Sequence, residues 1–406
     1  MKNILALSTL PLLSLAGATS LKPRDGSVYD AIIIGGGPSG LSALSGLARV
    51  RRNVLLIDSG EYRNGPTRHM HDVIGFDGVT PAYYRWAARQ QIAHYDTVSA
   101  INGTVTNIEP LNNNTEFSVA TTFLNGTDGT VSAKKIILAT GLHDLIPDTP
   151  GLLENWGKGI FWCPWCDGHE HADQSLGLLG PLEDAAGLVR EISTLNSDII
   201  AFVNGTDTPE ARAAAEASFP NWEKYLQIHN VTVENRTIAR INRLRDGGDP
   251  PADPSLPTAP EYDLFSVDFA EGGESVERAA FFTSFPDEQR SDVGEKLGVT
   301  LYGGRLSADN TKGLATNVPG VYAIGDANSD NVTNVPHALF TGKRTAVYLH
   351  VQLAREEADK ELAGNGTAVT RREEELNLRS VWEQMNPRDL LYAGEFDQYS
   401  SNYLML

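Results

Sequence analysis

The chain has 406 residues, 41% of them hydrophobic, and it is strongly acidic: 33 Lys and Arg against 52 Asp and Glu give a net charge of −19. This length is enough for two domains with complete hydrophobic cores. The negative charge, without a basic patch or interleaved aromatic and basic residues, argues against nucleic acid or an anionic membrane as a partner.

The first twenty residues, MKNILALSTLPLLSLAGATS, are typical of a secretory signal peptide. Lys2 precedes an apolar run, and the small residues at 16–18 match a cleavage pattern. A buried N-terminal helix is the alternative, but Pro11 and Gly17 would interrupt it. We therefore expect residues 1–18 to be a signal peptide and the protein to be extracellular. No later segment reaches the roughly 18 apolar residues that a membrane span needs.

Eight Asn-x-Thr sequons support an extracellular location, since chance would give roughly half that number. We expect glycans on several of them, and least at Asn331, which follows a predicted cofactor-binding turn. The sequons begin at Asn102, Asn113, Asn125, Asn204, Asn230, Asn235, Asn331 and Asn365.

Residues 28–58 predict a strand, a glycine turn, a helix and a second strand. The turn contains GxGxxG, with Pro38 and Ser39 between its last two glycines. Gly35 permits the tight turn, Gly37 lets a pyrophosphate approach the backbone, and Gly40 lets helix and strand pack. Asp58 ends the second strand and is expected to bind a ribose hydroxyl. This unit predicts a dinucleotide site.

Two later strands also end in small polar turns. The run KKIILATG ends in Thr140 and Gly141, and GVYAIGDA contains Gly325 and Asp326. In flavoproteins with two dinucleotide folds, such turns lie beside the first site, with the Gly-Asp carboxylate near the ribityl and pyrophosphate groups. The predicted cofactor is therefore FAD.

Between these turns lies a second block, 151–300, which contains FWCPWCDGHEH and the only two cysteines of the chain, Cys163 and Cys166. Two apolar strands and a helix at 182–195 predict a second nucleotide-binding fold. The predicted fold class is α/β with two Rossmann-like domains, the second (151–300) inserted between the two parts of the first (28–150 and 301–350). Residues 247–260 read as a loop, and 351–406 as a charged helical extension with a stripe of Leu376, Val381 and Trp382.

The order GGGPSG, ATG, CPWCDG and GDA resembles the low-molecular-weight thioredoxin reductases from residue 28 to about 350. The resemblance implies a homodimer with a redox-active disulfide, in which Cys163 exchanges with substrate and Cys166 lies nearer the flavin. It makes Asp167 a proton-transfer group and Asp326 a flavin contact. It also implies that a flavin-contacting loop holds Ser59, Arg63, Asn64 and His71.

The sequence departs from those reductases where they bind NADPH. Alignment with their GxGxxA turn puts Gly180 first and Ala185 last, but Leu182 at the middle glycine, where a side chain would block a pyrophosphate. The basic cluster for a 2′-phosphate is also missing, because residues 201–211 contain no Arg or Lys. NADPH is therefore not an expected partner, and thiols become the expected electron donors.

This pattern is similar to the flavin-dependent thiol oxidases related to the thioredoxin reductases. It implies oxidation of glutathione-like or small dithiol substrates by O2, which yields H2O2. A dithiol oxidase closing a disulfide in a secondary metabolite, an NADPH-dependent thioredoxin reductase and a non-catalytic flavin-binding module remain alternatives. His169 and His337 are the first candidates for thiolate stabilisation or proton transfer, and His171 is the next. Trp162 and Trp165 could line the substrate cleft, and no metal is expected.

Overall fold

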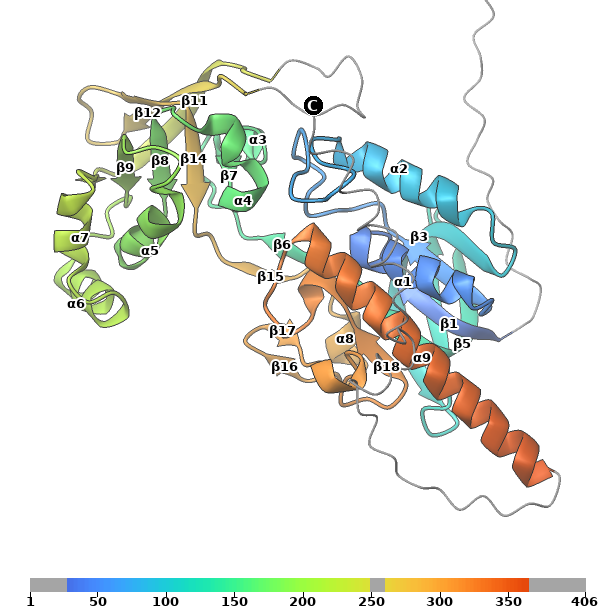
Figure 1. The fold of residues 1–406 in the computed structure, drawn as a ribbon. Coiled ribbons are helices and arrows are strands. Elements are labelled where there is room, and N and C mark those ends of the chain that lie inside the picture. Colours follow the sequence, from blue (N-terminus) through green and yellow to red (C-terminus); the bar gives the residue numbers. More distant parts are fainter. Residues whose placement is uncertain (1–27, 249–259, 365–406) are drawn as a thin grey trace, which may run out of the picture.

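The computed structural model describes residues 28–248 and 260–364. Two α/β parts lie side by side and are joined by a narrow connection (Figure 1). That connection is an antiparallel pair of short strands, β6 (Leu142–Asp144) and β15 (Asp287–Gln289), one on each crossing of the chain. The predicted signal peptide and the stripe at 376–382 fall outside the described residues. No described helix is both long enough and apolar enough to cross a bilayer.

The larger part is built on a six-stranded sheet whose central strand, β1, is buried on both faces and accordingly reads as a continuous apolar run. Strands β1, β2, β5 and β18 and the first half of β3 are parallel, and β4 joins the far ends of β3 and β5 in antiparallel pairing. The strands are β1 (Tyr29–Ile34), β2 (Val54–Asp58), β3 (Val98–Leu111), β4 (Glu116–Phe123), β5 (Asp128–Leu138) and β18 (Val321–Ala323).

Helices α1 (Pro38–Arg49) and α9 (Val335–Gly364) pack against each other on this sheet, with α2 (Pro81–Ile92) beside α1 (Figure 1). Glycines allow the close approach, because a Cβ added at Gly342 would lie 2.2 Å from the carbonyl oxygen of Ser39. Strand β18 and helix α9 follow the smaller part in sequence. The sheet of the larger part is therefore completed only after the chain has passed through the smaller part and returned. Smaller elements nearby are α8 (Val293–Lys296), β16 (Leu301–Tyr302) and β17 (Arg305–Leu306).

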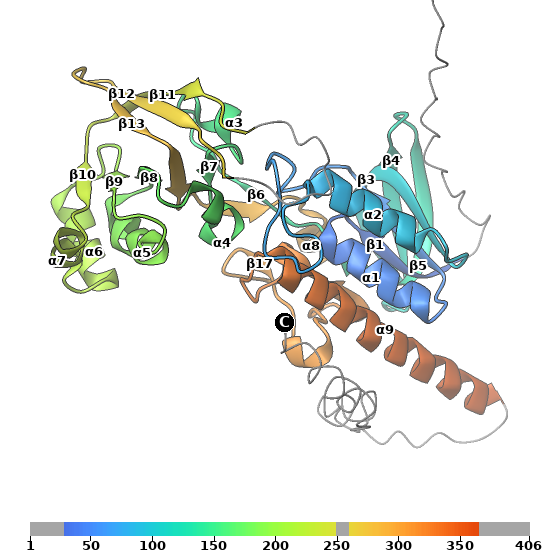
Figure 2. The ribbon, with the colours of Figure 1, turned by 45° about the horizontal axis from the view of Figure 1, so that its top comes forward.

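The smaller part has a parallel five-stranded sheet in the order β10-β9-β8-β14-β7. Helices α5, α6 and α7 lie on one side of it, and the antiparallel strands β11, β12 and β13 lie on the other (Figure 2). Its strands are β7 (Ile160–Phe161), β8 (Leu176–Leu179), β9 (Ile199–Phe202), β10 (Thr232–Glu234) and β14 (Ala280–Thr283). The remaining elements are α3 (Leu152–Asn155), α4 (Pro164–Asp167), α5 (Leu182–Ile192), α6 (Pro209–Ser218), α7 (Trp222–Ile228), β11 (Ile238–Arg245), β12 (Leu264–Phe269) and β13 (Val276–Arg278).

The predicted α/β class with two Rossmann-like sheets is confirmed. The helix expected at 182–195 is α5, which ends at Ile192, and the charged segment expected after residue 350 continues α9 as far as Gly364. Each sheet buries its own apolar cluster, so each part has a separate core.

Candidate active site

A cavity of about 730 Å³ runs from the glycine turn of the larger part to the CxxC segment of the smaller part. Its walls come from the turns after β1 and β5, the loop after β2, the segment before α9, and α4. Most of the predicted site residues line it: Gly35, Gly37, Pro38, Ser39, Ser59, Arg63, Asn64, His71, Thr140, Gly141, Cys163, Cys166, Asp167 and Asp326. Segments far apart in sequence therefore meet at one site.

The three glycines of GxGxxG differ in what surrounds them. A Cβ at Gly35, whose φ is +111°, would lie 2.2 Å from the carbonyl oxygen of Ala139, and one at Gly40 would lie 2.0 Å from that of Gly35. A Cβ at Gly37 would have no atom within 4 Å. Gly35 and Gly40 therefore serve close packing, whereas Gly37 leaves open space at the N-terminus of α1.

This helix N-terminus suits a pyrophosphate. The first turn of α1 carries no acidic residue, and its N-cap, Gly37, makes no side-chain capping bond. The free amides and the helix dipole favour an anion there. Farther along the cavity, the hydroxyl oxygen of Thr140 is buried with no hydrogen-bond partner among the described residues. The cavity thus offers an anion cradle and an unsatisfied polar group, as an extended dinucleotide requires.

Asp58 does not lie on the cavity wall. Its Oδ1 accepts hydrogen bonds from the amides of Gly36 and Gly60, both at 3.1 Å, and its Oδ2 accepts from the hydroxyl of Tyr62 and from Arg89. The carboxylate expected to bind a ribose therefore already accepts hydrogen bonds from protein donors, and through them it stabilises the glycine turn after β1. Gly40 and Gly325 also lie behind the lining, at packing positions.

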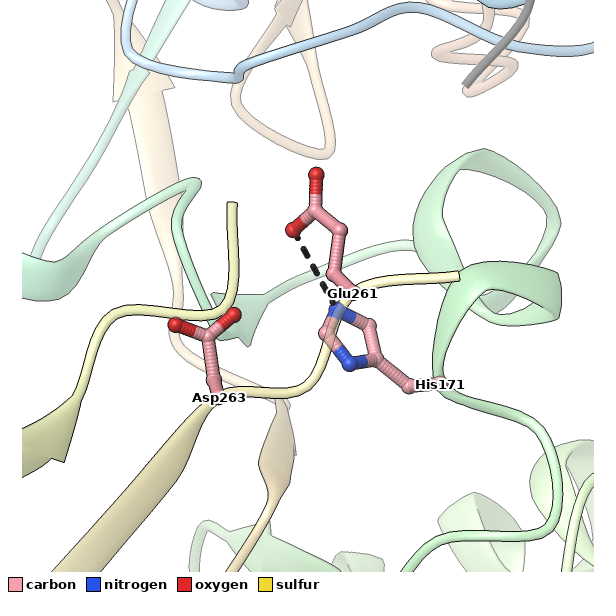
Figure 3. Close-up of side chains that lie close together, drawn as sticks. All are labelled: His171, Glu261 and Asp263. Carbon is pink, nitrogen blue, oxygen red and sulfur yellow. Dashed lines mark ion pairs between the residues drawn. The ribbon is translucent and has the colours of Figure 1, made fainter. Parts of the chain in front are cut away.

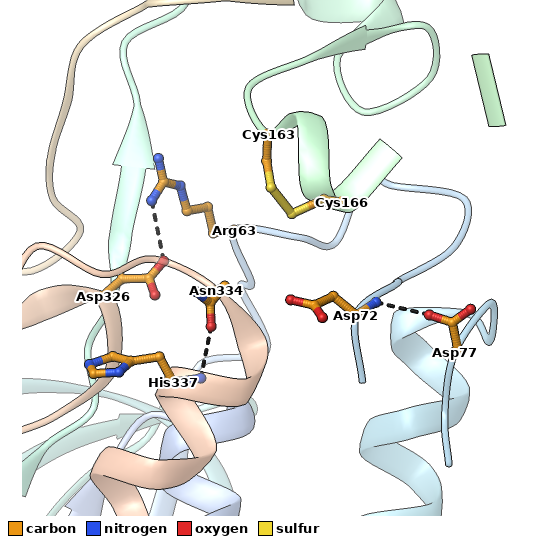
Figure 4. The surroundings of a disulfide bond; sticks show 8 residues. All are labelled: Arg63, Asp72, Asp77, Cys163, Cys166, Asp326, Asn334 and His337. Atoms are coloured by element: carbon orange, nitrogen blue, oxygen red, sulfur yellow. Dashed lines mark hydrogen bonds and ion pairs between the residues drawn. A yellow bond between two sulfur atoms is a disulfide. The ribbon is translucent and has the colours of Figure 1, made fainter. Parts of the chain in front are cut away.

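Arg63 ties the connecting strands to the predicted flavin site. Its guanidinium binds Asp144 on β6 at 2.5 Å and Asp287 on β15 at 2.9 Å. It also binds Asp326 at 3.2 Å (Figure 4). Burial raises the pKa of Asp326, and the charge of Arg63 opposes that shift. Arg63 thus fixes the position of Asp326 relative to both crossings of the chain.

Cys163 and Cys166 form a disulfide, with their Cα atoms 5.2 Å apart, at the start of α4. Figure 4 shows it across the cavity from Arg63, Asp326 and Asn334. Both cysteines are partly exposed. Trp162 stacks on Trp156, with ring centroids 5.2 Å apart, whereas the side chain of Trp165 is 71% exposed at the mouth. The disulfide is therefore accessible from the cavity, next to an apolar rim.

Asp167 follows Cys166 and is buried, and its Oδ2 has no hydrogen-bond partner among the described residues. Burial raises its pKa well above the ordinary value, and the neighbouring carboxylates of Glu170 and Glu261 raise it further, against the opposing charge of Arg68. Burial thus favours the protonated form of Asp167, which can donate a proton beside the disulfide.

Two of the predicted histidines lie outside the cavity lining. The Nε2 of His337 is 2.6 Å from the Oδ2 of Asp330, and Figure 4 shows its ring directed away from the disulfide. His169 is exposed on the short 3-10 helix His169–His171. By contrast, His69 and His71 both line the cavity. Closeness to the CxxC motif in sequence therefore did not predict which histidine side chains face the cavity.

Comparison with known proteins agrees with this geometry. The family described as "Pyridine nucleotide-disulphide oxidoreductase" matches residues 29–180. A "Probable thioredoxin reductase" of Arthroderma benhamiae is 47% identical over 87% of this chain and 85% of its own length. "Thioredoxin reductase aclD" of Aspergillus oryzae is 29% identical over 82% and 99%. The crystal structure of HlmI has a TM-score of 0.70 and 28% identity over 84% of this chain and 98% of its own.

The chain belongs to the thioredoxin reductase-like family of pyridine nucleotide-disulphide oxidoreductases. It is an FAD-binding disulfide oxidoreductase. The cradle at Gly37, the unsatisfied hydroxyl of Thr140 and the carboxylate of Asp326 are the groups on the cavity wall that fit FAD.

A buried ionic cluster joins the two parts of this family member behind the disulfide. Arg68, from the loop between β2 and α2, binds Glu261 and Asp263 just before β12, and the Arg68–Asp263 distance is 2.9 Å. Arg243 on β11 also binds Asp263, which is fully buried. Sequence reasoning missed this cluster because its members are nearly 200 residues apart with no local motif.

His171 lies against the same carboxylates, with its Nε2 3.7 Å from Glu261 (Figure 3). Burial lowers the pKa of His171, although Glu261 and Asp263 oppose the shift. His171, Glu261 and Asp263 lie close enough together to hold a cation. However, Arg68 and Arg243 already neutralise the carboxylates, so we interpret the cluster as an interdomain ion pair.

The second βα turn, where relatives in this family bind a nicotinamide nucleotide, differs from the first. The amide of Leu182, the first residue of α5, donates a 3.0 Å hydrogen bond to the hydroxyl of Thr206. Glu183 and Asp184 occupy the first turn. The expectation that the Leu182 side chain itself blocks the turn was wrong, because that side chain is buried in the core under α5.

Proposed function

We propose that this protein is a secreted, FAD-dependent thiol oxidase that converts two thiols and O2 into a disulfide and H2O2. One observation carries the proposal: the α1 cradle opens into the cavity that holds the disulfide, whereas the equivalent α5 turn is closed. Electrons can then enter from thiols at the cavity mouth but not from a nicotinamide nucleotide bound at α5.

The case against NADPH is electrostatic. A pyrophosphate at the start of α5 would have to displace the Thr206 hydroxyl and lie against Glu183 and Asp184. The nearest guanidinium after β9, that of Arg212, is held by Asp207 and Glu223. The first helical turn of α1 has neither a capping side chain nor an acidic residue, and the carboxylate of Asp58 binds only before it, at the amide of Gly36. This contrast between two equivalent helix starts supports one nucleotide site in the chain.

The disulfide supplies the proposed chemistry. A substrate thiolate attacks the sulfur of Cys163, the S–S bond breaks, and its electron pair stays on Cys166. A second thiolate attacks the mixed disulfide and releases the oxidised product, which leaves two reduced cysteines. Asp167 provides a proton beside the leaving sulfur, because burial raises the pKa of its carboxyl and so favours the protonated form. Bound FAD would supply the two-electron chemistry that links the reduced cysteines to O2.

Glutathione-like thiols and small dithiols are the proposed substrates. The mouth of the cavity is open at Trp165, which is 71% exposed and offers an apolar contact next to Cys163. A dithiol oxidase acting on a secondary metabolite uses the same arrangement. The names of the relatives favour the alternative activity, that of a thioredoxin reductase.

The proposed location of the protein is extracellular. Its proposed form is a glycosylated homodimer. The sequons Asn113, Asn125, Asn204 and Asn230 are exposed, which is compatible with glycans. Asn331 lines the cavity, so a glycan there would compete with the cofactor.

The test is oxygen consumption by the FAD-loaded protein in the presence of glutathione. We expect one O2 consumed and one H2O2 formed per oxidised glutathione. The Cys163→Ser and Cys166→Ser variants should each keep bound flavin and lose this turnover. Thiol-independent oxygen consumption, or full turnover by either variant, would refute the proposed function.

A further inference from the structure

A second, much smaller cavity lies behind the disulfide. Its volume is about 10 Å³, close to the least that holds a single water molecule. The imidazole nitrogens of His69 and His171 and the Oδ2 of Asp167 are buried there without a hydrogen bond among the described residues. The lining consists of Arg68, His69, His71, Gly157, Phe161, Asp167, Glu170, His171 and Glu261. So many titratable groups around one small space suggest proton movement.

Three residues belong to the walls of both cavities: Asp167, His69 and His71. Of these three, Asp167 is the one next to the reacting disulfide, since it directly follows Cys166 in sequence. Once it has given up its proton, its carboxylate would be buried with an unpaired oxygen, which is costly. A route that returns a proton to Asp167 is therefore needed for each turnover.

His71 and Glu170 lie along such a route. The Nε2 of His71 is 3.4 Å from the Oε1 of Glu170, which lines the small cavity together with Asp167. The Nδ1 of His71 is 3.7 Å from the Oδ2 of Asp77, whose side chain is 61% exposed. Small rearrangements would bring these groups into hydrogen-bond range. A path then leads from solvent through Asp77, His71 and Glu170 to the small cavity, and it ends at Asp167.

We propose that His71 and Glu170 form a proton path that returns a proton from solvent to Asp167 during thiol–disulfide exchange. The substrate thiol loses its proton to solvent, and its thiolate forms a bond to Cys163 as the Cys163–Cys166 bond breaks. The Cys166 thiolate takes the proton of Asp167, and the path restores that proton from solvent. Electrons and protons therefore balance without a further reactant. The inference rests on the proposed function only for the exchange at the disulfide.

The charges around Asp167 are compatible with this assignment. Burial raises the pKa of Asp167 and lowers that of His171, so for both residues it favours the uncharged form. The pKa of Glu261 is lowered, because His69 and Arg68 outweigh the effect of burial, so it stays ionised. The charged and titratable groups facing the site from all the surrounding segments are Arg68, His69, His71, Glu170, His171, Glu261 and Asp263.

The test measures disulfide reduction directly. Oxidised wild type, His71→Ala, His71→Gln and Glu170→Gln are mixed anaerobically with dithiothreitol, quenched with an alkylating reagent and weighed by mass spectrometry. The chain has only two cysteines, so the mass reports their reduction alone. Rates are divided by the thiolate concentration at each pH. The control is His94→Gln, an exposed histidine away from both cavities.

We expect all three path variants to be about 10-fold slower than wild type near neutral pH, as for loss of proton transfer, and their pH profiles to flatten. Added imidazole should restore much of the rate of His71→Ala but not of Glu170→Gln, and His94→Gln should match wild type. A wild-type rate in His71→Ala and His71→Gln, or slow rates with an unchanged pH profile and no effect of imidazole, would overturn the proposal. Because the attack of thiol on the disulfide precedes any electron transfer to flavin or O2, failure here is distinct from failure of the oxidase activity.

Discussion

Arg68 gives the sharpest prediction about what holds the two parts of the protein together. Its side chain is 13% exposed, and it binds Glu261 and Asp263, whose side chains are 9% and 0% exposed. Arg68→Met keeps much of the apolar stem but removes the charge. Asp263 keeps Arg243 as a partner, whereas the ion-pair partners that remain for Glu261 among the described residues are His69 and His171.

Breaking a buried ion pair from one side costs about 3–5 kcal/mol. Because Arg243 still compensates Asp263, we expect the lower end, about 3 kcal/mol, or a fall in Tm of about 4 °C for a chain of this size. The control is Arg212→Met, which removes an exposed arginine with two carboxylate partners and should leave Tm almost unchanged.

The loss in Arg68→Met should also depend on pH. Glu261 has a lowered pKa in the folded protein, so it contributes stability above its unfolded pKa that disappears as the pH falls through the folded value. Without Arg68 that pKa rises. The difference in Tm between wild type and variant should therefore shrink as the pH is lowered from 7 to about 4. Equal Tm values at pH 7, or a difference that grows in acid, would refute this reasoning.

Three further predictions concern the cavity. Asp167→Asn should slow reduction of the disulfide by thiol about 100-fold in anaerobic stopped flow. The raised pKa of Asp167 in the folded wild type makes that protein lose stability as the pH increases, so the Tm of the variant should rise relative to wild type. Gly37→Val should keep the wild-type circular dichroism spectrum and lose bound FAD. Gly35→Val should fail to fold, because a Cβ at Gly35 collides with backbone and one at Gly37 does not. Thr206→Val removes the cap on α5 but not Glu183 and Asp184, so it should not gain affinity for NADPH in a fluorescence titration; tight binding would contradict the electrostatic argument.

The parts of the site that sequence could predict are those encoded locally. GxGxxG between a strand and a helix, the strand ends at Thr140 and Asp326, and the CxxC beside Asp167 all reach the cavity, because each motif fixes its own backbone. Asp58 was placed at the correct strand end, but its oxygens are taken by Tyr62 and Arg89, donors that no local pattern identifies.

Leu182 illustrates a different error. It was read as an obstacle in the turn, but α5 has apolar residues at i, i+3, i+4 and i+7, namely Leu182, Ala185, Ala186 and Val189, and all are buried. The helical period thus contained the information that its side chain faces the core. The Arg68 cluster and the Thr206 cap arise from tertiary contacts, which single-sequence patterns do not contain.

The most direct test of the central claim is an anaerobic titration of the FAD-loaded protein, followed at the flavin absorbance band, with NADPH in one cuvette and glutathione in another. We predict that glutathione bleaches the band, that NADPH leaves it unchanged, and that admitting air restores the colour while H2O2 forms. Bleaching by NADPH with no response to glutathione would contradict this prediction and would assign the protein to the NADPH-dependent reductases.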